Sequence, residues 1–209
     1  MSDAPKSDAP KSDAPMSDAP MSDAEADLAL IEATLNGNLQ AFDLLVKKYQ
    51  SRIVSLANRM VKDSATAEDI AQETFIKAYR ALPNFRQDSA FYTWLYRIGI
   101  NTAKNHLSSR HRTPSSHNEE FDEASQMGRP QLQEQATPER QLMAEDLKKV
   151  IDQSLAELPE ELKVAFLLRE LEGLSYEDIS HIMECPIGTV RSRIFRARES
   201  ISKRIEEMD

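Results

Sequence analysis

Apolar side chains recur every three or four residues along most of residues 25–206, the spacing of one face of an α-helix. A first helix is marked by Leu28, Ile31 and Leu35 and is expected to stop near Gly37. The inward face of a longer second helix is predicted to carry Phe42, Leu45, Val46, Tyr49, Ile53, Leu56 and Met60. Alternating apolar and polar runs are nearly absent, so the pattern favours helices over sheet.

Two more helices are expected before residue 113. The third is expected to begin near Ser64 and to stop at Leu82-Pro83. Its inward side is predicted to hold Ile70, Phe75, Ile76 and Tyr79. After a short loop over residues 83–88, Ser89 is the expected N-cap of a fourth helix. The apolar residues of this fourth helix are Trp94, Leu95, Ile98 and Leu107.

Breaks in the helical pattern divide the chain into segments. Residues 1–24 contain a repeated Ser-Asp-Ala-Pro unit, and proline at every fifth position forbids a continuous helix, so a disordered tail is predicted. Residues 25–112 are predicted to form one helical domain. Residues 113–137 are rich in acids, glutamine and proline, and they are predicted to be a flexible acidic linker. Residues 138–206 are predicted to form a second helical domain, which makes the fold class all-α with two small domains.

Residues 174–199 predict two short helices around a tight turn. Ser175 is a natural N-cap, and Asp178 stands three residues later, in the capping-box position. Residues 184–186 break the first helix, and Gly188-Thr189 are expected to start the second. The apolar anchors of the two helices are Ile179, Ile182, Val190 and Ile194. This arrangement is typical of a helix-turn-helix.

The outer face of the second of these helices is predicted to carry Arg191, Ser192, Phe195 and Arg196. Arginine can bind guanine O6 and N7 in a bidentate manner, and each such pair discriminates by about 1–3 kcal/mol. Serine reaches bases or phosphates, and phenylalanine suits a thymine methyl group or a sugar. Arg193, Arg198 and Lys203 lie further round the helix and suit phosphates. A merely solvated basic face accounts for Arg198 and Lys203, but it accounts poorly for an exposed phenylalanine between two arginines.

A net charge of −9 opposes DNA binding by the chain as a whole, so the distribution of the charge matters. Between residues 186 and 204, Glu199 is the single acidic residue. The basic residues of that stretch are Arg191, Arg193, Arg196, Arg198, Lys203 and Arg204. An acidic chain with one basic helix is expected to bind DNA weakly on its own and to need a partner.

Other function classes are less compatible with the sequence. It contains no glycine-rich phosphate loop, and Cys185 and the four histidines (106, 111, 117 and 181) lack metal-ligand spacing. We therefore expect no enzyme, no cofactor, no metal and no small-molecule substrate. A stand-alone repressor or activator could use the same helix-turn-helix, whereas a pure interaction module would not need the basic face. No apolar run is long enough for a membrane span and no secretory signal is present, so a cytoplasmic protein is expected.

Three motifs in the two domains resemble extracytoplasmic-function (ECF) sigma factors of the sigma-70 family. The sequence SYEDISHIMECPIGTVRSRIFRAR (175–198) resembles their region 4, and AEDIAQETFIKAYRAL (67–82) resembles their polymerase-binding helix. The sequence FRQDSAFYTWLYRIGINTAKNHL (85–107) resembles the segment that recognises the promoter −10 element. The resemblance covers nearly all of residues 25–206 and is closest to the envelope-stress group, which includes the sigma-E and alginate regulators. An SDAP array before the first helix is not usual in that family.

The resemblance implies an alternative sigma factor that directs RNA polymerase to promoters, with region 2 in residues 25–112 and region 4 in residues 138–206. It implies that the −35 element is read by Arg191, Ser192, Phe195 and Arg196. The −10 element would be bound by Asn84, Phe85 and Asn101. The clamp helices of the largest polymerase subunit would be bound by Asp69, Gln72 and Glu73. Apart from the resemblance, these last three residues predict only a solvated helix face.

Further partners follow from the same resemblance: the polymerase flap, promoter DNA and a membrane-anchored anti-sigma factor. The linker 113–137 would thread into the polymerase between the two promoter-binding sites. Phe91, Tyr92 and Trp94 are candidates for strand melting, although helical spacing places some of them in the core and favours burial for Trp94. Gly99 in the fourth helix is expected to allow close packing at a small cost in helix stability.

Overall fold

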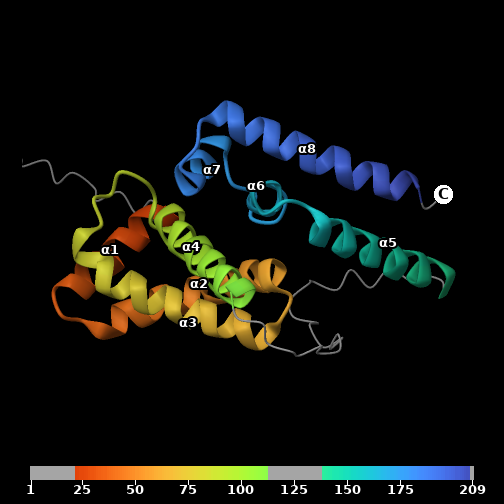
Figure 1. The fold of residues 1–209 in the computed structure, drawn as a ribbon. Helices are drawn as coiled ribbons and strands as arrows, with labels where there is room; N and C mark the ends of the chain where they lie inside the picture. The colour runs from red at the N-terminus through yellow and green to blue at the C-terminus, as the bar shows by residue number, and fades with distance from the viewer. Residues whose placement is uncertain (1–21, 113–137, 208–209) are drawn as a thin grey trace, which may run out of the picture.

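The computed structural model describes residues 22–112 and 138–207, which form helices and no strand (Figure 1). In the first range these are α1 Asp23–Leu35, α2 Leu39–Val61, α3 Ser64–Ala81, the short 3-10 helix η1 Leu82–Asn84 and α4 Phe91–Arg112. In the second they are α5 Pro138–Glu157, α6 Glu160–Glu170, α7 Tyr176–Met183 and α8 Ile187–Glu206. The all-α fold class is confirmed. The predicted linker 113–137 and residues 1–21 of the predicted tail lie outside the described residues.

Helices α1 to α4 pack into one unit around a shared apolar core (Figure 1). The apolar stripe of α2 lies inside as predicted, and Leu45, Ile53 and Leu56 are all fully or almost fully buried. The first helix begins at Asp23, within the predicted tail, because the Ser22 hydroxyl caps it and Glu25 completes a capping box. Burial of these apolar faces is the main stabilising contribution to the unit.

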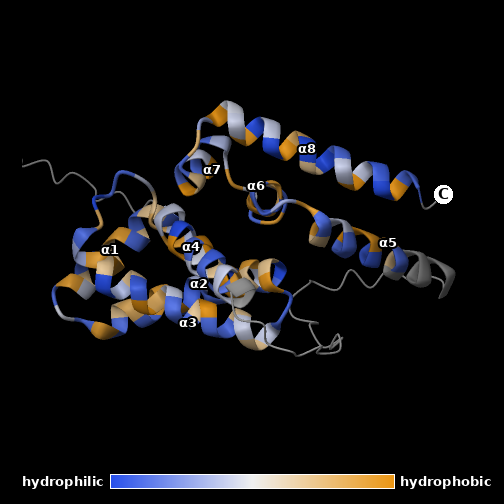
Figure 2. Ribbon diagram, in the orientation of Figure 1, coloured by the Kyte–Doolittle hydropathy of each residue, from blue (hydrophilic) through white to orange (hydrophobic). Residues whose placement is uncertain are grey.

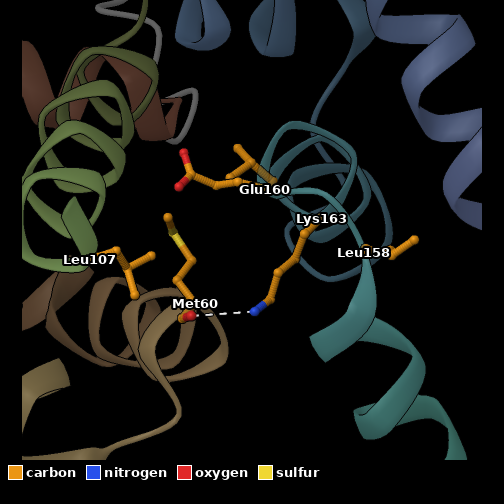
Figure 3. Close-up of a pocket in the computed structure, with 6 residues that line it drawn as sticks. Met60, Leu107, Leu158, Glu160 and Lys163 are labelled. Atoms are coloured by element: carbon orange, nitrogen blue, oxygen red, sulfur yellow. Dashed lines mark hydrogen bonds between the residues drawn. The ribbon is translucent and has the colours of Figure 1, made fainter. Parts of the chain in front are cut away.

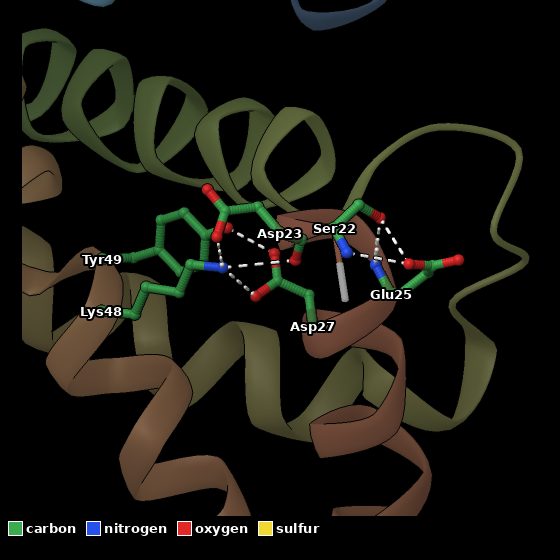
Figure 4. A network of polar contacts seen from close by, with 6 residues as sticks. All are labelled: Ser22, Asp23, Glu25, Asp27, Lys48 and Tyr49. Atoms are coloured by element: carbon green, nitrogen blue, oxygen red, sulfur yellow. Dashed lines mark hydrogen bonds and ion pairs between the residues drawn. The ribbon is translucent and has the colours of Figure 1, made fainter. Parts of the chain in front are cut away.

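A buried carboxylate joins α1 to α2 (Figure 4). Asp27 is 2% exposed, and it accepts hydrogen bonds from the Tyr49 hydroxyl and from Lys48 Nζ at 2.7 Å. Lys48 Nζ also reaches the carbonyl oxygen of Asp23 at 3.3 Å. A buried carboxylate is tolerated only when it is paired in this way. Burial, followed by the bond to Asp27, raises the pKa of Tyr49 above its usual range, so this phenol stays protonated as a donor.

Two details of the sequence prediction are wrong at the surface of this unit, the side of α3 on which Ile76 and Tyr79 lie and the N-cap of the fourth helix. Ile76 and Tyr79 were expected to point inward, but they are 44% and 42% exposed on the outer side of α3. Leu35, the last residue of α1, is also exposed. The fourth helix begins at Phe91, and the Trp94 N–H bonds to the Ala90 carbonyl, so Ala90 rather than Ser89 is at the N-cap position. An apolar pattern with a period of 3.6 residues identifies a helix. It does not distinguish an apolar residue in the core from one at the exposed edge of the helix's apolar face.

Helices α5 to α8 form a second group, in which α8 lies against α5, α6 and α7 (Figure 1). Leu158-Pro159 separates α5 from α6 as predicted, and Gly173 follows α6 with a φ of +66°. Apolar and hydrophilic residues alternate along α8 (Figure 2), as expected for a helix with one buried side. The buried side of α8 consists of Val190, Ile194, Ala197 and Ile201. None of the described helices combines the length and apolarity that a membrane span requires.

Candidate nucleic-acid interface

The helix-turn-helix is built from α7, a three-residue turn and α8. The Ser175 hydroxyl accepts the Asp178 N–H at 3.0 Å, which confirms the predicted N-cap. Glu184 ends α7 in the left-handed region with a φ of +51°, and Pro186 directly precedes α8. Proline needs no N–H partner at a helix start and has a backbone φ suited to it, so α8 begins at Ile187, one residue before Gly188. The turn thereby fixes the direction in which α8 leaves α7.

Apolar anchors hold the two helices together. Ile179 and Ile182 of α7 are buried, as are Val190 and Ile194 of α8, and all four were predicted. The Ser180 hydroxyl donates to the Cys185 carbonyl at 2.6 Å and so closes the turn. With this inner side fixed, the opposite side of α8 must face solvent.

The outer face of α8 presents the four predicted base-reading residues. Arg191, Ser192, Phe195 and Arg196 are all exposed, and Phe195 is 66% exposed. Arg191 lies with its guanidinium carbon 5.6 Å from the centre of the Tyr176 ring, a cation–π contact that limits its freedom. The Ser192 hydroxyl donates to the Thr189 carbonyl at 2.9 Å. We call these four residues the α8 reading face.

The cations beside the α8 reading face have partners within the chain. Arg193 pairs with Glu161 and lies 3.3 Å from Cys185 Sγ. Arg198 donates to Glu170, from its Nε at 3.0 Å. Of the cations predicted to contact phosphates, Lys203 alone has no such pairing among the described residues and is exposed. Arg193 and Arg198 therefore brace α8 against α6 and would reach phosphates only by exchanging these partners.

A second candidate surface surrounds the loop between α3 and α4. A hollow of about 420 Å³ lies there, and the predicted Asn84 and Phe85 line it. Its remaining lining residues are Arg86, Asp88, Ser89, Thr93, Trp94, Arg97 and His181. The mixture of aromatic rings, hydroxyls and charged groups in this lining suits a polar aromatic ligand such as a nucleobase.

Two aromatic rings, those of Phe85 and Trp94, line this hollow. The Phe85 ring is 5.1 Å from that of Trp94 and 6.0 Å from that of Phe91, centre to centre. Phe91 is 3% exposed and belongs to the core, while Trp94 and Tyr92 are half-buried. Phe91 is therefore a core residue, whereas Trp94, for which burial was favoured, is only half-buried and also lines the hollow. Asn101 is exposed on α4 but does not line the hollow.

Sequence reasoning missed part of this hollow. Arg97 was detectable, because it lies one helical turn after Thr93 in the motif that carries the −10 resemblance. His181 was not, because it belongs to α7 and reaches the hollow from the second half of the chain. No local pattern connects residues so far apart in sequence.

The three residues expected to contact polymerase lie on the outer side of α3. Asp69 and Gln72 are exposed, but Glu73 is partly covered and is held at 2.8 Å by both Lys77 and His106. The bonds from Lys77 and then His106 lower the pKa of Glu73 below its usual value, so it stays ionised at neutral pH. Ile76 and Tyr79, exposed on the same side by helical spacing, add apolar area that sequence reasoning had placed in the core.

Both halves of the chain are similar to known proteins. Residues 45–113 match the family model of sigma-70 region 2, and residues 148–201 match that of sigma-70 region 4. The RNA polymerase sigma-H factor of Pseudomonas aeruginosa is 52% identical over 185 residues, 88% of this chain and 96% of that protein. The ECF RNA polymerase sigma-E factor of Escherichia coli strain K12 is 49% identical over 183 residues, 87% of this chain and 95% of that protein.

Two solved structures share the fold. One is CnrH in complex with the cytosolic domain of CnrY, with a TM-score of 0.64 and 23% identity over 88% of this chain and 99% of that one. The other is the sigma factor RpoE of Bartonella quintana in complex with the anti-sigma factor NepR, with a TM-score of 0.58 and 23% identity over 79% of this chain and 96% of that one. No group of three or more acidic, histidine or cysteine side chains in the described ranges could hold a metal ion.

Proposed function

Because the chain belongs to the sigma-70 family as an ECF-type alternative sigma factor, we propose that its helices α8 and α4 read two separate elements of a promoter. Sigma factors are transcription initiation factors, and in our proposal this chain has no catalytic activity of its own. It binds core RNA polymerase in the cytoplasm and positions it at promoters of envelope-stress genes.

The α8 reading face binds the −35 element in the major groove. The observation that carries this proposal is the exposure of Phe195 between Arg191 and Arg196 on a helix braced from behind. The two arginines supply bidentate donors for guanine, and Phe195 supplies apolar contact for a thymine methyl group. Arg193 and Arg198 hold α8 in position through Glu161 and Glu170, which fixes the register of the four reading side chains.

The test is in vitro transcription by core polymerase on templates with a randomised −35 element. Arg191→Ala and Arg196→Ala should each relax base preference at one position, because each bidentate pair contributes about 1–3 kcal/mol of discrimination. Lys203→Ala is the matched control, since it removes one exposed cation from the same helix two turns further on. It should lower output evenly across templates without changing preference. Unchanged preference in both arginine variants would refute the −35 assignment.

The hollow at Phe85 accepts a base of the −10 element that has left the duplex stack. Phe85 would stack on that base, at about 1–3 kcal/mol per stacked base, and Asn84 would bond to its edge. Asn101 would contact the same strand from the exposed side of α4. Strand separation would then be driven by binding of the unpaired strand, since a flipped base must be stabilised in its pocket.

The outer side of α3 docks on the clamp helices of the largest polymerase subunit. Asp69, Gln72 and Glu73 supply the polar part of this contact, and Ile76 supplies apolar area at its centre. Ile76→Ser should therefore weaken competition for core polymerase against an unmodified sigma factor by about tenfold. Glu32→Ser, on the exposed side of α1, is the control and should compete as the unmodified chain does.

A membrane-anchored anti-sigma factor is the remaining proposed partner, and residues of region 4 would also contact the polymerase flap. CnrH was solved in complex with the cytosolic domain of CnrY, and the Bartonella RpoE was solved in complex with the anti-sigma factor NepR. We propose that such a partner covers the polymerase-binding side of α3 until an envelope-stress signal releases the chain.

A further inference from the structure

A cavity lies where α6 meets the C-terminal parts of α2 and α4, away from the two promoter-reading surfaces (Figure 3). Its volume is about 180 Å³. The apolar part of its wall consists of Met60, Leu107, Leu158 and Val164. Two charged residues of α6, Glu160 and Lys163, complete the lining. The wall is therefore largely apolar, and its charged groups come from a single helix.

The Lys163 side chain is buried in this wall. It is 9% exposed, whereas a lysine at a protein surface usually extends its ammonium group into water. Its Nζ donates to the Met60 carbonyl near the end of α2, at 3.3 Å (Figure 3). This is its one hydrogen bond within residues 22–112 and 138–207. An ammonium group has three N–H donors, so two remain for a further acceptor.

Lys163 has a surplus of positive charge around it. Glu160, the carboxylate in the cavity wall, lies one helical turn before Lys163 but pairs with Lys104 at 3.2 Å. Lys62, exposed at the end of α2, adds a second cation on the other side. Burial and then Lys62 lower the pKa of Lys163, whereas Glu160 acts in the opposite direction. The local balance of charge therefore favours an anion beside Lys163.

The size and the lining of the cavity restrict what this anion can be. An apolar cavity of about 150 Å³ is large enough to bind benzene, so this one accommodates a molecule of about six to nine non-hydrogen atoms. A bare inorganic anion would satisfy the ammonium group but would leave the apolar wall without contacts. A carboxylate that carries a short alkyl chain satisfies both parts of the lining, since the bonds of a carboxylate to an ammonium group are charge-assisted.

We propose that this cavity binds a small aliphatic carboxylate, with its charged oxygens on Lys163 Nζ and an alkyl chain of about five carbons against Met60, Leu107 and Leu158. The site is separate from the promoter-reading and polymerase-binding surfaces, and the inference does not rest on the function proposed for them. The lining residues come from both described ranges of the chain, so the bound acid contacts α2 and α4 as well as α6.

The test is a titration of the full chain with hexanoate, followed by nuclear magnetic resonance of carbon-13-labelled methionine, leucine and valine methyl groups. We expect a dissociation constant on the order of 1 mM or lower, because a ligand of this size gains only a small free energy for each atom. The largest shifts should belong to the methyl groups of Met60, Leu107, Leu158 and Val164, which line the cavity.

Two related molecules separate the contributions of charge and chain on the unmodified protein. Acetate keeps the carboxylate but lacks the chain, so it should bind at least tenfold more weakly than hexanoate. Hexan-1-ol keeps the chain but lacks the charge, and it should bind about tenfold more weakly. Equal affinity for acetate and hexanoate would indicate an ion site that makes no use of the apolar wall, and would overturn the proposal.

A pair of variants tests Lys163 itself. Lys163→Met keeps an unbranched side chain and removes the charge, so hexanoate should bind at least tenfold more weakly, while hexan-1-ol should bind no less tightly than to the unmodified chain. Lys62→Met is the matched control. It removes an exposed cation at the end of α2, and solvent screening should limit its effect to less than about threefold.

Three results contradict the site. Methyl groups of the cavity that do not shift up to the solubility limit of hexanoate would show that the acid does not bind there. Unchanged hexanoate affinity in Lys163→Met would place the acid elsewhere on the chain. If Lys163→Met folds poorly, the comparison of hexanoate with hexan-1-ol on the unmodified protein decides the role of the charge, and equal affinity for the two would overturn it.

Discussion

Phe195 is 66% exposed on a helix whose inner stripe, including Val190 and Ile194, is buried. Leaving an aromatic ring in water gives up the burial free energy that its neighbours gain. Exposed aromatic and arginine side chains on a rigid element are typical of residues that gain their energy from a partner. The same physical reasoning applies to Ile76 and Tyr79 on α3, which are also apolar and exposed.

Gly99→Ala should stabilise the first helical unit by about 0.5–1 kcal/mol. A methyl group at Gly99 would lie 3.6 Å from Ile53 Cδ1 and from Thr74 Cγ2, an ordinary contact distance, so alanine fits and gains helix propensity. Urea denaturation followed by circular dichroism measures the change. Gly37→Ala is the control and should destabilise, because Gly37 has a φ of +95°. A loss of stability in Gly99→Ala would contradict this account of the packing.

At the scale of single residues, the sequence predicted the exposure of the α8 reading face. All four residues lie within six positions of one helix, and the apolar residues on the opposite side of that helix are recognisable from their spacing. It placed Ile76 and Tyr79 wrongly, since both sit at the edge of an apolar stripe where a partner surface and a core look alike. The sequence also did not reveal the ion-pair partners of Arg193 and Arg198, because these partners are carboxylates of another helix, α6.

Helix ends decide how the elements are placed. Ser22, Asn38, Asp63 and Ser175 each cap a helix through a side-chain oxygen. Glu184 and Pro186 then set the turn that aims α8. These are local signals, so most helix starts were predictable to within a residue or two. The N-cap of α4 was predicted one position too early, at Ser89, because serine is a better capping residue than the alanine that follows it.

Ser175→Ala should cost about 1 kcal/mol of stability in the second half, because the N–H of Asp178 loses its cap. Transcription from a −35-dependent promoter should fall with it, since a frayed α7 no longer fixes α8. Ser200→Ala on the exposed side of α8 is the control. Thermal unfolding and run-off transcription are the measurements. An unchanged melting temperature would show that the cap contributes nothing.

At the scale of the whole molecule, the arrangement of the two halves could not be predicted from the sequence. The contacts Thr93–Asp178 and Tyr96–Glu172 join residues 85 and 76 positions apart. Carboxylates are common on helix faces in this acidic chain, and nothing local marks Asp178 and Glu172 as partners of α4. The sequence did predict an acidic protein with one basic helix, and that imbalance is consistent with weak DNA binding by the free chain.

The central claim is that this chain recognises DNA as part of RNA polymerase and not alone. The most direct measurement is transcription from a promoter library with core polymerase alone, the chain alone and both together, with start sites mapped. We predict specific starts only with both, sharing sequence elements at two fixed upstream positions, and weak DNA binding by the chain alone. Tight sequence-specific binding by the chain alone, with no polymerase-dependent starts, would contradict the account and indicate a stand-alone repressor or activator.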